Sequence, residues 1–192
     1  DGIGTEWACS VAHVSATSVR VDVGAAAVRN RESPLALTLA CAVVKSDPME
    51  QIVRHATELG VATIAPIMTE RTQATVGDRA GARWERIARE GAKQSGRNVL
   101  PEIREVQRFA EFLDRDVAEL KLMCWEKAER VWEPEAQTVD SISIIVGPEG
   151  GFTAEEIRLA AERGVLALSL GPRILRAETA ALAAIALIQH HH

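Results

Sequence analysis

Residues 144–156 read Ile-Ile-Val-Gly-Pro-Glu-Gly-Gly-Phe-Thr-Ala-Glu-Glu. The apolar start is typical of a strand buried on both faces of a parallel sheet. Thr153 and Glu156 have the spacing of a capping box, which predicts a helix after the turn. Glycines at the carboxyl end of such a strand let the backbone approach a ligand closely. The glycine spacing matches neither the dinucleotide nor the Walker pattern, so an ordinary strand-to-helix turn stays an alternative.

A second stretch of the same kind lies at 168–180, which reads Leu-Ser-Leu-Gly-Pro-Arg-Ile-Leu-Arg-Ala-Glu-Thr-Ala. We expect the two turns to lie side by side at one edge of the sheet and to share a ligand cavity. Arg176 and Glu178 precede an almost wholly apolar helix. Glu178 suits the positive end of a helix dipole, whereas Arg176 has the wrong sign and needs another explanation.

The rest of the chain after residue 34 alternates apolar strands with amphipathic helices. Such alternation predicts an α/β fold with a mostly parallel sheet covered on both faces. Asp47-Pro-Met-Glu50 is interpreted as a capping box with proline at the first helical position. The predicted strands are 37–44, 62–67, 103–106, 120–125, 142–146 and 165–170, and the predicted helices are 47–60, 80–96, 108–117, 153–163 and 177–189.

The first 30 residues have a different pattern. Residues 6–24 alternate like two short strands joined by a turn at 15–18, and 29–34 reads as a polar linker. Because a lone hairpin is marginal in water, we expect a remnant of a small β domain whose first strands lie upstream of Asp1. The predicted division is 1–30, 31–189, and 190–192, where three histidines look like the end of an affinity tag.

Composition excludes several classes of protein. The 192 residues are 47% hydrophobic and 26% charged, which supports a sizeable core. The longest apolar run, 180–188, is about half of the roughly 20 residues that a membrane helix needs, so no membrane span is expected. Three distant cysteines and two histidines outside the terminal three predict no disulfide framework and no metal site, and a reducing cytoplasm is the expected location.

Charge is distributed unevenly along the chain. The net charge is −5, yet residues 71–104 hold eight basic and four acidic residues. Several of the basic residues share a stripe of the helix predicted at 80–96. Such a stripe is either a solvated face or a surface for nucleic acid, and charge alone leaves both open.

The motifs together resemble one family, the SPOUT-superfamily methyltransferases that modify N3 of a uridine in 16S ribosomal RNA. The resemblance runs from about 31 to 189, and its two glycine turns, in this order, are its most specific part. The motifs that carry it are 45–50 (Lys-Ser-Asp-Pro-Met-Glu), 57–61 (Thr-Glu-Leu-Gly-Val), 70–72 (Glu-Arg-Thr), 94–97 (Gln-Ser-Gly-Arg), 147–151 (Gly-Pro-Glu-Gly-Gly) and 170–180.

The resemblance implies S-adenosylmethionine as methyl donor, bound in a C-terminal trefoil knot. It implies a homodimer built around the knot, the small ribosomal subunit and its 16S rRNA as partner, and an N-terminal PUA-like RNA-binding barrel of which 1–30 matches only the last strands. The residues it implies for the donor are Trp125, Gly147, Glu149, Gly150, Gly151, Leu170, Gly171, Ile174, Leu175 and Arg176.

The chemistry needs no metal, because methyl transfer from a sulfonium to a ring nitrogen is an in-line displacement that depends largely on positioning. Uracil N3 carries a proton, so the site must remove it or stabilise the anion. Arg176 is the expected stabiliser, and Glu178 or Glu149 is the expected base. Arg71, Gln94 and Arg97 are the expected contacts to RNA phosphates or to a flipped base.

Other interpretations stay open at this point. They are a SPOUT enzyme that acts on another RNA, a nucleotide-binding enzyme on a conventional Rossmann sheet, and a non-catalytic RNA-binding module. His55 is expected to be structural. Trp84, Trp125 and Trp132 either stack on a base or pack in the core, and core packing is the expectation for Trp84.

Overall fold

A computed structural model describes residues 2–27, 31–131 and 139–190 of the chain. The strands are β1 (Glu6–Val14), β2 (Val19–Ala27), β3 (Ala36–Ala42), β4 (Thr63–Met68), β5 (Glu102–Ile103), β6 (Gln107–Arg108), β7 (Leu120–Cys124), β8 (Ser141–Val146) and β9 (Leu166–Leu168). The helices are α1 (Ser46–Glu58), α2 (Ala80–Ser95), α3 (Phe109–Arg115), α4 (Ala154–Glu162) and α5 (Ala177–Gln189).

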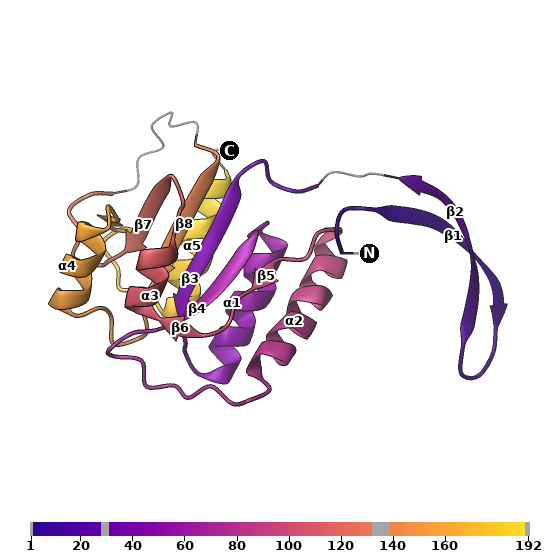
Figure 1. The fold of residues 1–192 in the computed structure, drawn as a ribbon, viewed down its shortest axis with the longest axis horizontal. Coiled ribbons are helices and arrows are strands. Elements are labelled where there is room, and N and C mark those ends of the chain that lie inside the picture. The colour runs from indigo at the N-terminus through magenta and orange to yellow at the C-terminus, as the bar shows by residue number, and fades with distance from the viewer. Residues whose placement is uncertain (1, 28–30, 132–138, 191–192) are drawn as a thin grey trace.

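The main sheet has seven strands and every pair in it is parallel, which confirms the predicted α/β class (Figure 1). Its order is β5-β4-β3-β8-β7-β9, and β6 also pairs with β4. Helices α1, α2 and α5 cover one face and α3 and α4 the other, so the molecule has one core on each face. Residues of β3 alternate between these cores, because successive side chains of a strand point to opposite faces.

Two local predictions are corrected by the structure. The capping box expected at 47–50 is wrong: α1 begins one residue earlier, its N-cap residue Lys45 makes no side-chain cap, and Ser46 Oγ bonds Glu50 Oε1 at 2.8 Å. The strand expected at 103–106 is two short strands, β5 and β6, each pairing with a different part of β4. The capping box of α4 is confirmed, with Thr153 Oγ1 accepting from the Glu156 N–H at 3.2 Å.

Residues 6–27 form an antiparallel hairpin, β1 and β2, that extends away from the main sheet (Figure 1). Nearly all of its described side chains are exposed, including valines on both strands. Its base is attached to the segment that follows α2, where the Gly4 N–H donates to the Asn98 carbonyl at 3.0 Å and the Leu100 N–H to the Gly2 carbonyl at 3.1 Å. The hairpin therefore makes few contacts beyond its base.

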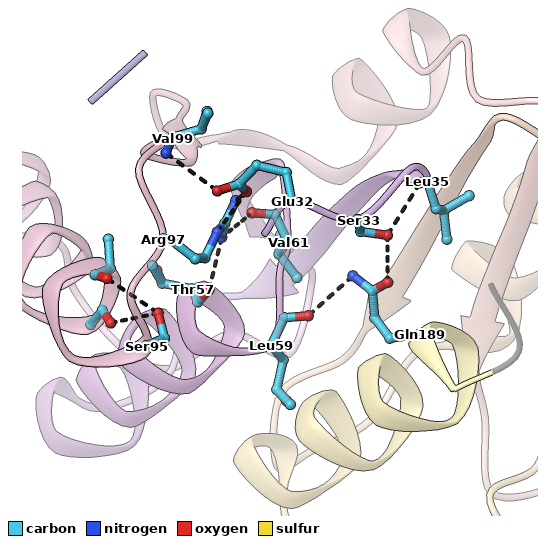
Figure 2. Close-up of polar contacts among 12 residues, drawn as sticks. Glu32, Ser33, Leu35, Thr57, Leu59, Val61, Ser95, Arg97, Val99 and Gln189 are labelled. Carbon is cyan, nitrogen blue, oxygen red and sulfur yellow. Dashed lines mark hydrogen bonds and ion pairs between the residues drawn. The ribbon is translucent and has the colours of Figure 1, made fainter. Parts of the chain in front are cut away.

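The linker after β2 is held by a buried ion pair (Figure 2). Arg97 Nη2 lies 2.6 Å from Glu32 Oε2, and only 5% of the arginine side chain is exposed. The same guanidinium donates to the carbonyls of Thr57 at 2.7 Å and Val61 at 3.0 Å. Arg97 thus joins the linker to the end of α1 and to the chain that enters β4.

Replacing one partner of this pair is expected to destabilise the fold. Glu32→Gln removes the negative charge opposite a buried guanidinium, and we expect the free energy of unfolding to fall by about 2 kcal/mol. Urea denaturation of both proteins measures the difference. The matched control is Glu90→Gln, whose partner Arg86 sits in a pair with 59% and 52% of the side chains exposed, and it is expected to cost less than about 0.5 kcal/mol. Equal losses in the two variants would contradict this role of the pair.

Membrane spans and metal clusters are both absent from the described part of the chain. None of the described helices is long and apolar enough to cross a membrane. No group of three or more histidine, cysteine or acidic residues in the described ranges is arranged to hold a metal ion. Of the predicted tag remnant, residues 191–192 lie outside the described residues, as do residues 28–30, which include the first two residues of the predicted linker.

Candidate active site

A cavity of about 230 Å³ lies at the carboxyl ends of β7, β8 and β9. Three turns form its walls: 124–126 after β7, 146–152 after β8, and 170–175 after β9. Ala177 and Ala180 of α5 also line it. The carboxyl edge of a parallel sheet is the usual place for a ligand in such folds. The structure therefore brings the two glycine turns together around one space.

The residues expected to contact a cofactor line this cavity, with one exception. Those in the lining are Trp125, Gly147, Glu149, Gly150, Gly151, Leu170, Gly171, Ile174 and Leu175. Arg176 is absent from the lining, whereas Arg173, which the sequence patterns did not single out, is part of it. The signal for Arg173 is its place in the turn, two residues after Gly171 and directly after a proline that cannot continue the strand.

Backbone geometry explains why three positions in the two turns are occupied by glycine. Gly151 has φ of 66° and Gly171 has φ of 107°, conformations that residues with a side chain rarely adopt. Gly147 has ordinary φ, but a Cβ there would lie 2.8 Å from Cε2 of Phe152. The first turn is closed by the Gly151 N–H, which donates to the Pro148 carbonyl at 2.9 Å. These glycines set the shape of the cavity wall.

The loop that follows β4 makes hydrogen bonds to the first glycine turn and to the helix after it. Glu156 is buried, and its carboxylate accepts from the N–H of Thr153 at 2.9 Å and of Glu70 at 2.8 Å. Beside it, Arg71 Nη1 donates to the Gly150 carbonyl at 2.9 Å. Sequence spacing revealed the capping role of Glu156 and missed its bond to Glu70, because that bond joins residues 86 positions apart.

Three residues were expected to contact RNA, and the structure separates them. Arg71 is exposed and lies against the glycine turn, so its contact with RNA stays a prediction. Gln94 is exposed on α2, and its prediction also stays untested. The guanidinium of Arg97 is buried and bonds Glu32 and two carbonyls (Figure 2), an arrangement that argues against its expected contact with RNA.

The three expected catalytic residues lie in or next to the segments that form the cavity. Arg176 is the N-cap residue of α5; its side chain is 84% exposed, and its Nη1 lies 4.0 Å from Glu178 Oε1. Glu178 is mostly buried in the first turn of α5. Glu149 is exposed and lines the cavity. Of the three, Glu149 alone is part of the described lining, while Arg176 and Glu178 are sequence neighbours of the lining residues Leu175 and Ala177.

The third wall, 124–126, consists of Cys124, Trp125 and Glu126. Burial raises the pKa of the Cys124 thiol to about 12, so the side chain is neutral and unreactive near pH 7. The neighbouring Trp125 N–H donates to the Leu168 carbonyl at 2.9 Å, which holds this wall against β9. Trp84 is 6% exposed and packs in the core as expected, and Trp132 lies outside the described residues. His55 bonds Glu58 at 3.1 Å on α1, away from the cavity lining.

Fold and cavity together define an α/β protein with a parallel sheet and, at its carboxyl edge, a cavity walled by two glycine turns and by residues 124–126. Residues 31–189 match the family of the RNA methyltransferase domain, and the chain belongs to this family.

Individual relatives agree with this assignment. The chain is 32% identical over 200 residues to ribosomal RNA small subunit methyltransferase E of Bacillus subtilis, covering 97% of this chain and 78% of the relative. The protein of the same name from Synechocystis is 37% identical over 163 residues, covering 82% of this chain and 54% of the relative. The chain thus spans about half the length of that relative.

The fold has close solved counterparts. One is the crystal structure of ribosomal RNA small subunit methyltransferase E from Neisseria gonorrhoeae bound to S-adenosylmethionine. It superposes with a TM-score of 0.93 at 33% identity, covering 99% of this chain and 80% of the other. The parallel sheet of this chain therefore has the same arrangement as the sheet of this methyltransferase relative.

Proposed function

We propose that this chain is the catalytic part of an enzyme that transfers a methyl group from S-adenosylmethionine to N3 of one uridine in 16S rRNA of the small ribosomal subunit. The observation that carries the proposal is the single cavity that both glycine turns share. Family membership and the donor-bound relative from Neisseria gonorrhoeae support it.

The cavity fits the chemistry of the donor. Beside Gly171 a Cβ would find no atom nearer than 3.8 Å, so a ligand has room against the backbone there. Leu170, Ile174 and the neutral Cys124 offer apolar surface, while Glu149 offers a negative charge. A molecule with a sulfonium centre and an adenosine needs both kinds of contact.

The charged residues in and next to the cavity walls have the chemistry that the acceptor base, a uracil, requires. When bound, S-adenosylmethionine supplies an electrophilic methyl group on sulfur. Arg176 would donate charge-assisted hydrogen bonds to the uracil oxygens and so stabilise the anion left when N3 loses its proton. Glu178 or Glu149 would accept that proton. The methyl group then forms its bond to N3 as its bond to sulfur breaks.

The finer architecture belongs to the same proposal. A trefoil knot formed by the chain from β8 to α5 is supported by the order of the sheet, in which β8 lies between β3 and β7, and by α5, which packs back on α1 and β8. We take 31–189 as the methyltransferase domain and the exposed hairpin as part of a PUA-like RNA-binding domain. We also propose that the protein forms a homodimer around the knot and is located in the cytoplasm.

Mass spectrometry of small-subunit rRNA from cells that lack this protein tests the proposed reaction. We expect one N3-methyluridine to disappear and to return when the gene is restored, because in-line transfer to N3 is the chemistry that the site supports. Restoring a Gly171→Val gene, which blocks the cavity, is expected to fail. An unchanged rRNA methylation pattern would contradict the proposal. If a methyl group were missing from another RNA instead, that RNA would be the substrate in place of 16S rRNA.

A further inference from the structure

The basic stripe of α2 contains cations of two kinds. In the first kind a carboxylate neutralises the charge, as in the pairs Arg83–Glu50 and Arg86–Glu90. Arg89 and Lys93 are of the second kind: both are exposed, and neither has an acidic partner among the residues that the structure describes. They lie four positions apart on one helix face, where like charges repel each other. An anion bound between them would relieve that repulsion.

Both of these cations line a cavity that the methyl-transfer site does not use. It has a volume of about 560 Å³ and lies between the second half of α2 and the start of the hairpin. The hairpin contributes Trp7, whose side chain is 42% exposed, and the neighbouring Glu6. An exposed tryptophan and two cations that have no acidic partner among the described residues therefore line the same cavity.

The two walls of this cleft are connected by hydrogen bonds of ordinary length. Its floor is the segment 97–100, which bonds the hairpin start through Gly2 and Gly4. Asn98 adds a side-chain bond from its Nδ2 to the Gly4 carbonyl at 3.1 Å. The linker at the other end of the hairpin is fixed to the same segment by Glu32 and Arg97 (Figure 2). The spacing between indole and cations is thus built into the fold.

We infer that this cleft is a subsite for one nucleotide of the RNA substrate, with the base stacked on Trp7 and the phosphate bound by Arg89 and Lys93. The inference rests on the proposed function for the identity of the polymer. An aromatic face beside paired cations is the arrangement by which proteins bind single-stranded nucleic acid. Glu6, on the wall of the base, is an acceptor for base N–H groups.

The position of the subsite indicates its role. It adjoins the end of α2 that leads into β5, whereas the methyl-transfer cavity lies at the opposite, carboxyl edge of the sheet. A helix of 16 residues is about 24 Å long. The nucleotide bound here is therefore distant from the methylated base. The cleft selects and orients the RNA, so it affects KM rather than kcat.

Binding of a fluorescein-labelled oligouridylate, followed by anisotropy at several salt concentrations, tests the subsite. For the double variant Arg89→Gln/Lys93→Gln we expect affinity to fall at least about tenfold. The slope of log K against log salt should shrink by about 0.7, because the variant no longer neutralises the one phosphate that the two cations bind. Trp7→Leu should lower affinity about tenfold and leave the slope unchanged, because it removes stacking and no charge.

The matched control is Arg83→Gln/Arg86→Gln, which removes the same charge from the same helix outside this cleft. It is expected to keep most of the affinity. An equal loss in the control, an unchanged slope in the cleft variant, or no oligouridylate binding by the unmodified protein would overturn the inference. Calorimetry with S-adenosylmethionine separates the two proposals, because donor binding should be the same in all these variants and its absence would count against the proposed function alone.

Discussion

Gly171→Val is expected to lower the affinity for S-adenosylmethionine by about a hundredfold or more. Gly171 lines the cavity between the two turns, and only Arg173 Nη2, at 3.8 Å, lies near the position of a Cβ. A branched side chain there fills space that the donor needs, and overpacking of this kind costs up to about 3 kcal/mol. Isothermal titration calorimetry measures the loss directly.

A matched variant separates this blockage from backbone strain. Gly164 also has a positive φ, 76°, and a Cβ there would meet nothing within 4 Å, but it follows α4 and lies outside the cavity. Gly164→Val therefore carries a similar strain, about 1–2 kcal/mol of stability, without touching the donor site. We expect Gly164→Val to bind S-adenosylmethionine normally. If both variants lose affinity equally, the cavity at Gly171 is not the donor site. Gly150 is a poorer test, because a Cβ there would press on Arg71 Cβ at 3.1 Å.

Arg176→Ala is expected to lower kcat for methyl transfer by about a hundredfold while leaving donor affinity within about twofold. Its side chain is exposed at the start of α5 and is absent from the cavity lining, so it is placed to act on the acceptor base. Loss of one donor that stabilises a developing anion typically costs two to three orders of magnitude in rate. Single-turnover assays with small-subunit rRNA, together with calorimetry, give the two numbers.

Arg173→Ala is the comparison for this variant. Arg173 lies three residues earlier in the same turn and does line the cavity. Its replacement should therefore weaken donor binding and leave the chemical step little changed. If Arg176→Ala instead raises the Kd for S-adenosylmethionine by the same factor as it lowers kcat, Arg176 holds the donor and the assignment as anion stabiliser fails.

The main architecture is predictable because its signals are local. Residues 142–146 are all buried, as a continuous apolar run in a parallel sheet requires. The Thr153 and Glu156 spacing predicted the start of α4 correctly. At α1 the same reasoning failed, since Ser46 and Asp47 both suit a helix start and only the fold decides where the helix begins.

Long-range contacts explain what sequence spacing missed. Arg97 reads as one more cation of a basic stripe, and only Glu32, 65 positions away, makes it part of the interior. Arg71 stays on the surface, and its bond to Gly150, 79 positions away, is a contact that only the fold reveals. The glycine turns were easier to place, because neighbouring strands of a parallel sheet must end at the same edge.

The most direct test of the account is a crystal structure of the protein grown with S-adenosylmethionine. We predict density for the donor in the cavity, with contacts to 147–151 and 170–175 at once, and the sulfonium methyl directed toward the opening beside Arg176. Density at another place, or an empty cavity at saturating donor, would contradict the claim that these two turns form one binding site.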